Sequence, residues 1–243
     1  MLDFHDVPAI ERVIVALDCS EEEALRIAAS LEGKAKWMKV GMTLYYAAGP
    51  RIVEALKQRG FNVFLDLKFY DIPHQVEGAA AAAVMSGSDM ITMHASGGVA
   101  MMEAAQRGVE KAAAQLCREA PITLGITVLT SMNDESLNEI GVERNTVDQV
   151  RMLAGLTAKA GISGVVCSPQ EVPMLREVLG PDAYIVTPGV RPAGAALGDQ
   201  SRVTTPRQAF ENGSSHIVVG RPITAAPDAL AAFEAIAAEL AGM

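Results

Sequence analysis

The sequence predicts a single (β/α)₈ barrel domain over residues 1–243. Eight short runs of strand-forming residues alternate with helical patterns, and most of these runs are apolar throughout, as in strands covered on both faces. This alternation favours a parallel sheet with right-handed crossovers. A barrel of this kind needs about 250 residues, and no Pro/Ser-rich linker or shift in composition divides the chain.

The eight predicted strands occupy residues 13–18, 37–41, 62–67, 90–94, 123–129, 164–167, 184–187 and 216–220. Eight units favour a closed barrel over an open doubly wound sheet. No GxGxxG pattern follows the first run, which further argues against a dinucleotide-binding fold.

Helices are predicted between these strands from their start and stop signals. Ser20 with Glu23 forms the pattern of a capping box, Pro50 suits a first helical turn, and Gly60 suits a helix end. Residues 76–85 are rich in alanine, which favours a closely packed helix.

The charge and the termini exclude several classes of partner. A formal net charge of −9 argues against binding to nucleic acid or to an anionic membrane surface. The first 13 residues lack the pattern of a signal peptide, and no apolar run reaches the ~18 residues of a membrane span. The spacing of Cys19, Cys117 and Cys167 matches neither a zinc site nor a redox motif. We therefore expect a cytoplasmic protein.

A charged cluster follows the third predicted strand, where the active site of such a barrel lies. Asp66 and Lys68 are two residues apart on a strand and so point to one face, and Asp71 lies just beyond. Buried charges need partners. Lys39 ends the neighbouring second strand, and we expect it to join the other three charges in a preorganised array. A solvated, salt-bridged strand end and a surface lysine are the structural alternatives.

Two Gly/Arg turns predict a phosphate site. Gly189 with Arg191 follows the seventh strand, and Gly220 with Arg221 follows the eighth. Barrels often bind phosphate with these two loops, using backbone N–H groups and the guanidinium fork. The Gly-rich segment 193–202 is a candidate lid in which Gln200 reaches the phosphate, or an ordinary loop.

Four further residues have two interpretations each. Asp18 could accept a hydrogen bond from a ribose hydroxyl or cap the next helix. Thr130 or Ser131 could contact a base edge or initiate a turn, and His94 is more simply a structural residue than a ligand.

Together these residues resemble the orotidine 5′-monophosphate decarboxylase family, in its bacterial form. The resemblance spans nearly the whole chain, in order, through residues 13–18, 39, 66–73, 127–131, 188–192, 198–200 and 218–223. It implies conversion of orotidine 5′-monophosphate to UMP and carbon dioxide in pyrimidine biosynthesis, with no cofactor and no metal.

The resemblance also implies a role for each residue. Lys68 would donate a proton to carbon 6 of the pyrimidine, Asp66 would lie beside the substrate carboxylate, and Lys39 and Asp71 would complete the charge network. Asp18 would hold the ribose together with Lys39. Thr130, or alternatively Ser131, would contact the base. The residues implied to bind phosphate are Arg191, Gln200, Gly220 and Arg221.

The family resemblance implies a homodimer, in which Asp71 and Ile72 reach into the neighbour's active site. Two alternative functions remain open. Related sugar-phosphate barrels share the D-x-K-x-x-D pattern but use magnesium and need an acidic ligand near the end of strand 2, where Lys39 would repel the ion. A non-catalytic phosphonucleotide-binding barrel would explain Arg191 and Arg221 but not two lysines interleaved with two aspartates.

Overall fold

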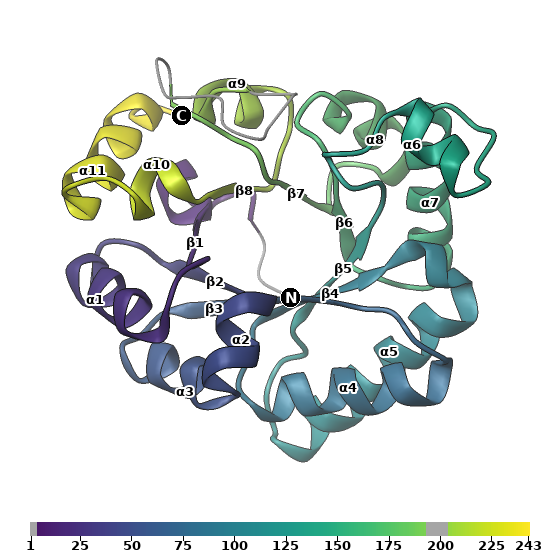
Figure 1. Cartoon of the computed structure of the whole chain (residues 1–243), viewed down its shortest axis with the longest axis horizontal. Coiled ribbons are helices and arrows are strands. Elements are labelled where there is room, and N and C mark those ends of the chain that lie inside the picture. The colour runs from purple at the N-terminus through teal and green to yellow at the C-terminus, as the bar shows by residue number, and fades with distance from the viewer. Residues whose placement is uncertain (1–3, 193–203) are drawn as a thin grey trace.

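Eight parallel strands close into a barrel in which each strand pairs with the next and β8 pairs with β1 (Figure 1). The computed structural model describes residues 4–192 and 204–243. The predicted fold class is confirmed. The strands are β1 (Val13–Ala16), β2 (Trp37–Gly41), β3 (Asn62–Phe69), β4 (Met90–His94), β5 (Ile122–Ile126), β6 (Gly164–Val166), β7 (Tyr184–Thr187) and β8 (His216–Val219).

Helices surround the barrel and cover the outer face of its strands (Figure 1). Within the described residues, none of them is long and apolar enough to cross a membrane. They are η1 (Ala9–Arg12), α1 (Glu21–Leu31), α2 (Met42–Ala48), α3 (Arg51–Gln58), α4 (Pro73–Met85), η2 (Ala95–Gly97), α5 (Gly98–Gln115), α6 (Asp134–Glu139), α7 (Thr146–Lys159), α8 (Val172–Leu179), α9 (Pro206–Glu211), α10 (Arg221–Thr224) and α11 (Ala229–Leu240).

The predicted capping box at the start of α1 forms only in part. The Ser20 side chain accepts a hydrogen bond from the Glu23 backbone N–H at 3.3 Å, as expected. The Glu23 carboxylate instead accepts bonds of 2.9 and 2.6 Å from Arg26, one turn further along the helix. The Glu23 carboxylate therefore bonds to the charged Arg26 on the same helix face instead of to the backbone N–H of Ser20.

Strand boundaries differ from the prediction mainly at the C-terminal ends. β1, β5, β6 and β8 end one to three residues early, because the backbone leaves the ladder where the loops begin. β3 instead continues to Phe69, two residues beyond its predicted end. Its pairing with β4 shifts in register between Leu65 and Phe69, so β3 contains a bulge next to the charged cluster.

Side chains alternate in and out of the barrel, and this periodicity positions the site. One apolar cluster fills the interior and contains Ile14, Trp37, Phe64 and Met90. A larger cluster lies between the strands and the helices. Two residues further along β3 from Phe64 the inward position is Asp66, so the interior becomes polar toward the C-terminal ends of the strands.

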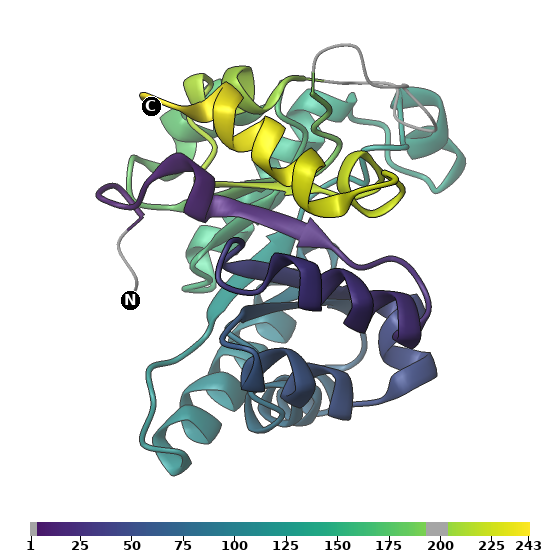
Figure 2. The ribbon, with the colours of Figure 1, turned by 90° about the vertical axis from the view of Figure 1, so that its left-hand side faces the viewer.

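Aromatic rings cluster at the opposite end of the barrel. The His216 ring packs against the rings of Trp37, Tyr184 and Phe4, with centroids 5.5, 5.8 and 6.5 Å away. Burial, with a smaller contribution from the Arg12 charge, lowers the pKa of His216 to about 3. In Figure 2 this end, where β1 starts, lies on the left together with the C-terminus. The other end remains available for a binding site.

Candidate active site

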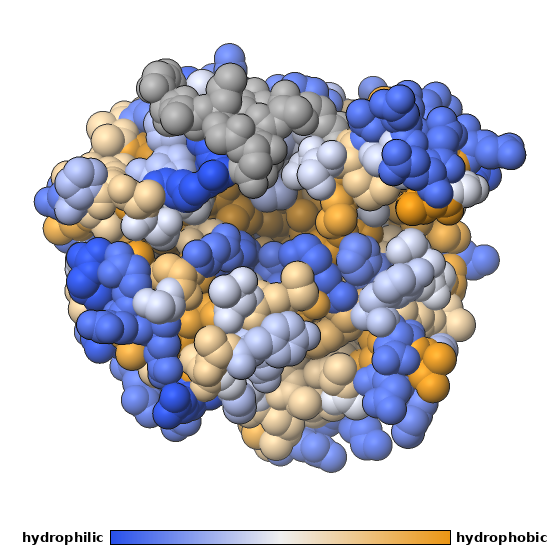
Figure 3. All heavy atoms as spheres, in the orientation of Figure 1, coloured by the Kyte–Doolittle hydropathy of each residue, from blue (hydrophilic) through white to orange (hydrophobic). Residues whose placement is uncertain are grey.

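A cavity of about 450 Å³ opens at the C-terminal ends of the strands. Figure 3 shows this face of the molecule, hollowed near its centre, with hydrophilic residues beside the hollow. Apolar side chains including Phe64, Ile126 and Val128 form part of the wall. The predicted site residues that line the cavity are Asp18, Lys39, Asp66, Lys68, Thr130, Arg191, Gly220 and Arg221.

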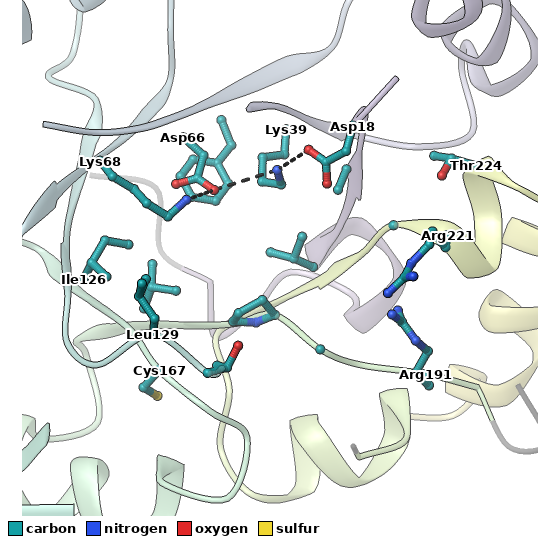
Figure 4. Close-up of a pocket in the computed structure, with 18 of the residues that line it drawn as sticks. Asp18, Lys39, Asp66, Lys68, Ile126, Leu129, Cys167, Arg191, Arg221 and Thr224 are labelled. Carbon is teal, nitrogen blue, oxygen red and sulfur yellow. Dashed lines mark hydrogen bonds and ion pairs between the residues drawn. The ribbon is translucent and has the colours of Figure 1, made fainter. Parts of the chain in front are cut away.

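Four of these side chains form a charged row of alternating sign, Asp18–Lys39–Asp66–Lys68 (Figure 4). Lys39 Nζ lies 2.9 Å from Asp18 Oδ1 and 3.8 Å from Asp66 Oδ2. Lys68 Nζ lies 2.8 Å from the same Asp66 oxygen. The side chains of Lys39 and Asp66 are only 10% and 12% exposed, so water screens this pair weakly. The row therefore presents ordered charges to the cavity.

Asp66 is held as a carboxylate in this row. Burial acts to raise the pKa of Asp66, but the Lys39 and Lys68 ammonium groups and hydrogen bonds from Lys68 and Thr92 outweigh it. The net effect is a pKa below the ordinary value for aspartate. Nearby, burial and the Lys68 charge lower the pKa of His94, whose ring lies 5.4 Å from that of Tyr70. His94 is therefore a neutral neighbour of the charged row.

Gly41 leaves open the space beside the Asp18–Lys39 contact, and sequence reasoning did not identify it. A Cβ at this position would lie 2.9 Å from Asp18 Oδ1 and 3.2 Å from Lys39 Nζ. Any larger residue would therefore push against the ion pair. Its place two residues after Lys39, on the same face of β2, is the only sequence signal for this role.

The two arginines lie together in another part of the cavity. Arg191 follows β7 and Arg221 opens α10 directly after β8. Their guanidinium groups point toward one another (Figure 4). Like charges that converge in this way are suited to share an anion, and guanidinium forks match phosphate oxygens. Thr224, one turn after Arg221, also lines the cavity and was not predicted.

Two predicted site residues, Asp71 and Ile72, are not brought to the cavity of the chain that carries them. Asp71 is exposed and Ile72 is 64% exposed; neither lines the cavity, and Asp71 Oδ1 accepts a bond of 2.6 Å from the Ile72 N–H. The expectation that strand adjacency alone brings Asp71 to Lys39 and Asp66 is therefore wrong within one chain, because the backbone turns outward after β3. Gln200 lies outside the described residues.

Thr130 and Ser131 can now be distinguished by position. Thr130 lines the cavity on the loop after β5, whereas Ser131 is exposed and does not line it. Of the two candidates for the base contact, only Thr130 is placed to reach a bound molecule. Within the described residues, no group of three or more His, Cys, Asp or Glu side chains is arranged to hold a metal ion.

Known proteins resemble this chain over nearly its full length. Residues 11–236 match the family described as orotidine 5′-phosphate decarboxylase / HUMPS. The chain is 50% identical over 234 residues to an orotidine 5′-phosphate decarboxylase of Moorella thermoacetica, covering 96% of this chain and 93% of that protein. It is 47% identical over 233 residues to one of Nitrosococcus oceani, covering 96% and 98%.

A solved structure supports the same conclusion. The crystal structure of orotidine 5′-phosphate decarboxylase from Lactobacillus acidophilus superposes with a TM-score of 0.84 at 41% identity, covering 96% of this chain and 100% of that chain. Fold and sequence identity therefore agree over nearly the full length. The chain belongs to the orotidine 5′-phosphate decarboxylase / HUMPS family.

Proposed function

We propose that Lys68 delivers the proton to carbon 6 in the decarboxylation of orotidine 5′-monophosphate to UMP. Membership of the family assigns this reaction of pyrimidine biosynthesis to the chain. The observation that carries this proposal is the charged row in which Lys68 and Lys39 flank the buried Asp66. The row lies against apolar cavity walls, where electrostatic interactions are stronger than in water.

The chemistry of the reaction explains why an ordered ammonium group is needed. Breaking the bond between carbon 6 and the carboxylate leaves an electron pair in the plane of the ring, where the ring π system does not delocalise it. An ammonium group already oriented toward that carbon stabilises the charge without reorganising, as water would have to. Lys68 then transfers one N–H proton to carbon 6, carbon dioxide leaves, and the neutral amine regains a proton from solvent.

The remaining cavity residues suit the other parts of the nucleotide. Asp18 accepts from Lys39, and this pair is suited to hold ribose hydroxyls. Thr130 lines the same cavity and suits the base, while Arg191, Gly220 and Arg221 suit the phosphate. Binding energy from the phosphate, remote from the bond that breaks, helps to organise the reacting groups. We assign Gln200 to the phosphate as well, on the family resemblance alone.

The assignment of substrate is tested by a decarboxylation assay on the purified protein. We expect orotidine 5′-monophosphate to yield UMP and carbon dioxide in equal amounts, with and without EDTA. Chelator resistance is expected because Lys39 occupies the position where related sugar-phosphate barrels need an acidic metal ligand. Tight UMP binding without release of carbon dioxide would contradict catalysis, and loss of activity in EDTA would contradict the metal-free mechanism.

Asp71 and Ile72 are assigned to the neighbouring active site of a homodimer. Both are exposed in the chain that carries them, in the loop directly after β3. Ile72 is one of several exposed apolar side chains here, with Tyr70 in the same loop and Met42 and Tyr46 after the adjacent β2. An apolar surface of this kind is suited to subunit contact. Each chain then forms one catalytic domain, a single barrel. Its active site is completed by residues of the partner subunit.

Mixed dimers test this assignment. Lys68→Ala and Asp71→Ala subunits should each be nearly inactive alone, but a random mixture should recover about a quarter of wild-type activity. Half of the dimers are then mixed, and each mixed dimer holds one complete site. The matched control mixes Lys68→Ala with Asp66→Ala, which belong to one site and should recover nothing. Absence of recovery in the first mixture would place Asp71 in the site of its own chain.

A further inference from the structure

Thr92 is a buried polar residue of β4 that lies opposite the bulge in β3. It has no exposed surface and does not line the cavity. Its hydroxyl accepts a hydrogen bond from the backbone N–H of Lys68 at 2.9 Å and donates one to Asp66 Oδ1, also at 2.9 Å. One side chain therefore contacts the backbone of one member of the charged row and the carboxylate of another.

The bulge explains why a hydroxyl is needed there. Leu65 pairs with Ile91 and Phe69 pairs with Met93, so three residues of β3 face the single residue Thr92. Ladder pairing between the backbones is interrupted over this stretch, and a buried N–H without a partner is costly. The Thr92 hydroxyl takes the place of the missing carbonyl acceptor for Lys68.

The backbone of Lys68 is also in an uncommon conformation. Its φ angle is +55°, in the left-handed region that few residues other than glycine adopt. Such a conformation persists only where surrounding contacts stabilise it, and it is concentrated at functional sites. It turns the Lys68 side chain so that Nζ reaches Asp66 Oδ2 at 2.8 Å. The bond from the Lys68 N–H to Thr92 is therefore one of the contacts that maintain this turn.

The Asp66 carboxylate is held through both of its oxygens as a result. Oδ1 accepts from Thr92, and Oδ2 faces Lys68 and Lys39. The Thr92 hydroxyl uses its proton for Asp66 and a lone pair for Lys68, so both of its hydrogen bonds have a definite direction. The carboxylate and the ammonium group thereby share one anchor on the adjacent strand.

We propose that Thr92 is a positioning residue for the decarboxylation, which orients Asp66 and Lys68 without touching the substrate. This inference rests on the function proposed above for Lys68. Displacement of a reacting group by about 1 Å can lower a rate by about 100-fold. Loss of the Thr92 hydroxyl should therefore lower kcat, while the groups that bind ribose and phosphate keep their places.

The test compares Thr92→Val, which keeps the shape and removes the hydroxyl, with Thr92→Ser, which keeps the hydroxyl. We expect Thr92→Val to lower kcat by about 10- to 100-fold, with KM and the Kd for UMP within about threefold of wild type. Thr92→Ser should recover kcat to within about threefold. The matched control is Thr123→Val, because Thr123 is equally buried and its hydroxyl bonds Gln106 and Ser163 away from the site.

Several results would overturn the proposal. They are a folded Thr92→Val enzyme with unchanged kcat, a parallel loss of UMP affinity, or an equal loss of kcat in Thr123→Val. Should Thr92→Val fail to fold, Thr92→Cys replaces it against Thr92→Ser with the same criteria, since a thiol is a weak donor of similar size. Wild-type turnover in the same assay separates a failure of the proposed function from a failure of the Thr92 inference. An inactive wild type contradicts the proposed function, whereas an active wild type matched by Thr92→Val contradicts only this inference.

Discussion

Replacement of Lys68 by alanine is expected to lower kcat by at least about 10⁴-fold, because it removes both the proton donor and the nearest positive charge. The fold should survive. Asp66 keeps its ion pair with Lys39 and its hydrogen bond from Thr92, so no buried carboxylate is left alone. Steady-state turnover of orotidine 5′-monophosphate, together with thermal unfolding of the same samples, measures both expectations.

A second lysine provides the matched control for this experiment. Lys57 also pairs with a partly buried aspartate, with its Nζ 2.7 Å from Asp89 Oδ2, but it does not line the cavity. Lys57→Ala should lower the free energy of unfolding and leave kcat unchanged. If folded Lys68→Ala retains turnover within about tenfold of wild type, Lys68 is not the acid. A similar loss of kcat in both variants would show that any broken ion pair disables the enzyme.

Arg221→Ala is expected to weaken binding of UMP by about 100-fold or more while uridine binds within about threefold of wild type. A hydrogen bond to a charged group typically contributes about 1.5–3 kcal/mol, and one guanidinium can donate two such bonds to a phosphate. Together they correspond to about 100-fold or more in affinity. The loss should be confined to ligands that carry phosphate, because Arg221 lies with Arg191 in a different part of the cavity from Asp18 and Lys39 (Figure 4). Calorimetric titration with both ligands measures the difference directly.

The control here separates local from general charge effects. Arg59→Ala removes the same charge from a surface ion pair with Glu32, 3.0 Å long and away from the cavity. UMP affinity should be unchanged in that variant. Equal losses of UMP and uridine affinity in Arg221→Ala would contradict the phosphate assignment. A comparable loss in Arg59→Ala would point to net charge rather than to a specific contact.

The barrel and most of the site could be predicted from the sequence. Strand periodicity and the alternation with helices determine a parallel barrel, and parallel strands place all their C-terminal ends on one face. Lys39 and Asp66 therefore had to be close together once their strands were recognised as neighbours. The same argument placed Arg191 and Arg221 on that face, since β7 and β8 are adjacent.

Contacts that depend on register and turn geometry could not be predicted in this way. The pairing register of β3 and β4 shifts between Leu65 and Phe69, and this shift is the bulge. The left-handed backbone of Lys68 and the bridging role of Thr92 occur at the same place. Sequence spacing fixes which face a strand residue occupies, but an inserted residue changes the pairing without changing the pattern of apolar residues. Asp71 lies beyond the end of β3, where strand periodicity no longer fixes direction, and it does not line the cavity of its own chain.

Residue types, strand order and the face that carries the chemistry were thus determined by the sequence itself. Tertiary structure decided the pairing within the charged row, the need for Gly41 beside Asp18, and the hydroxyl that joins Lys68 to Asp66. The physical reason is the distance along the chain over which each effect acts. Periodic burial acts between near neighbours along the chain, whereas a hydrogen bond about 3 Å long depends on how two separate strands come to lie against each other.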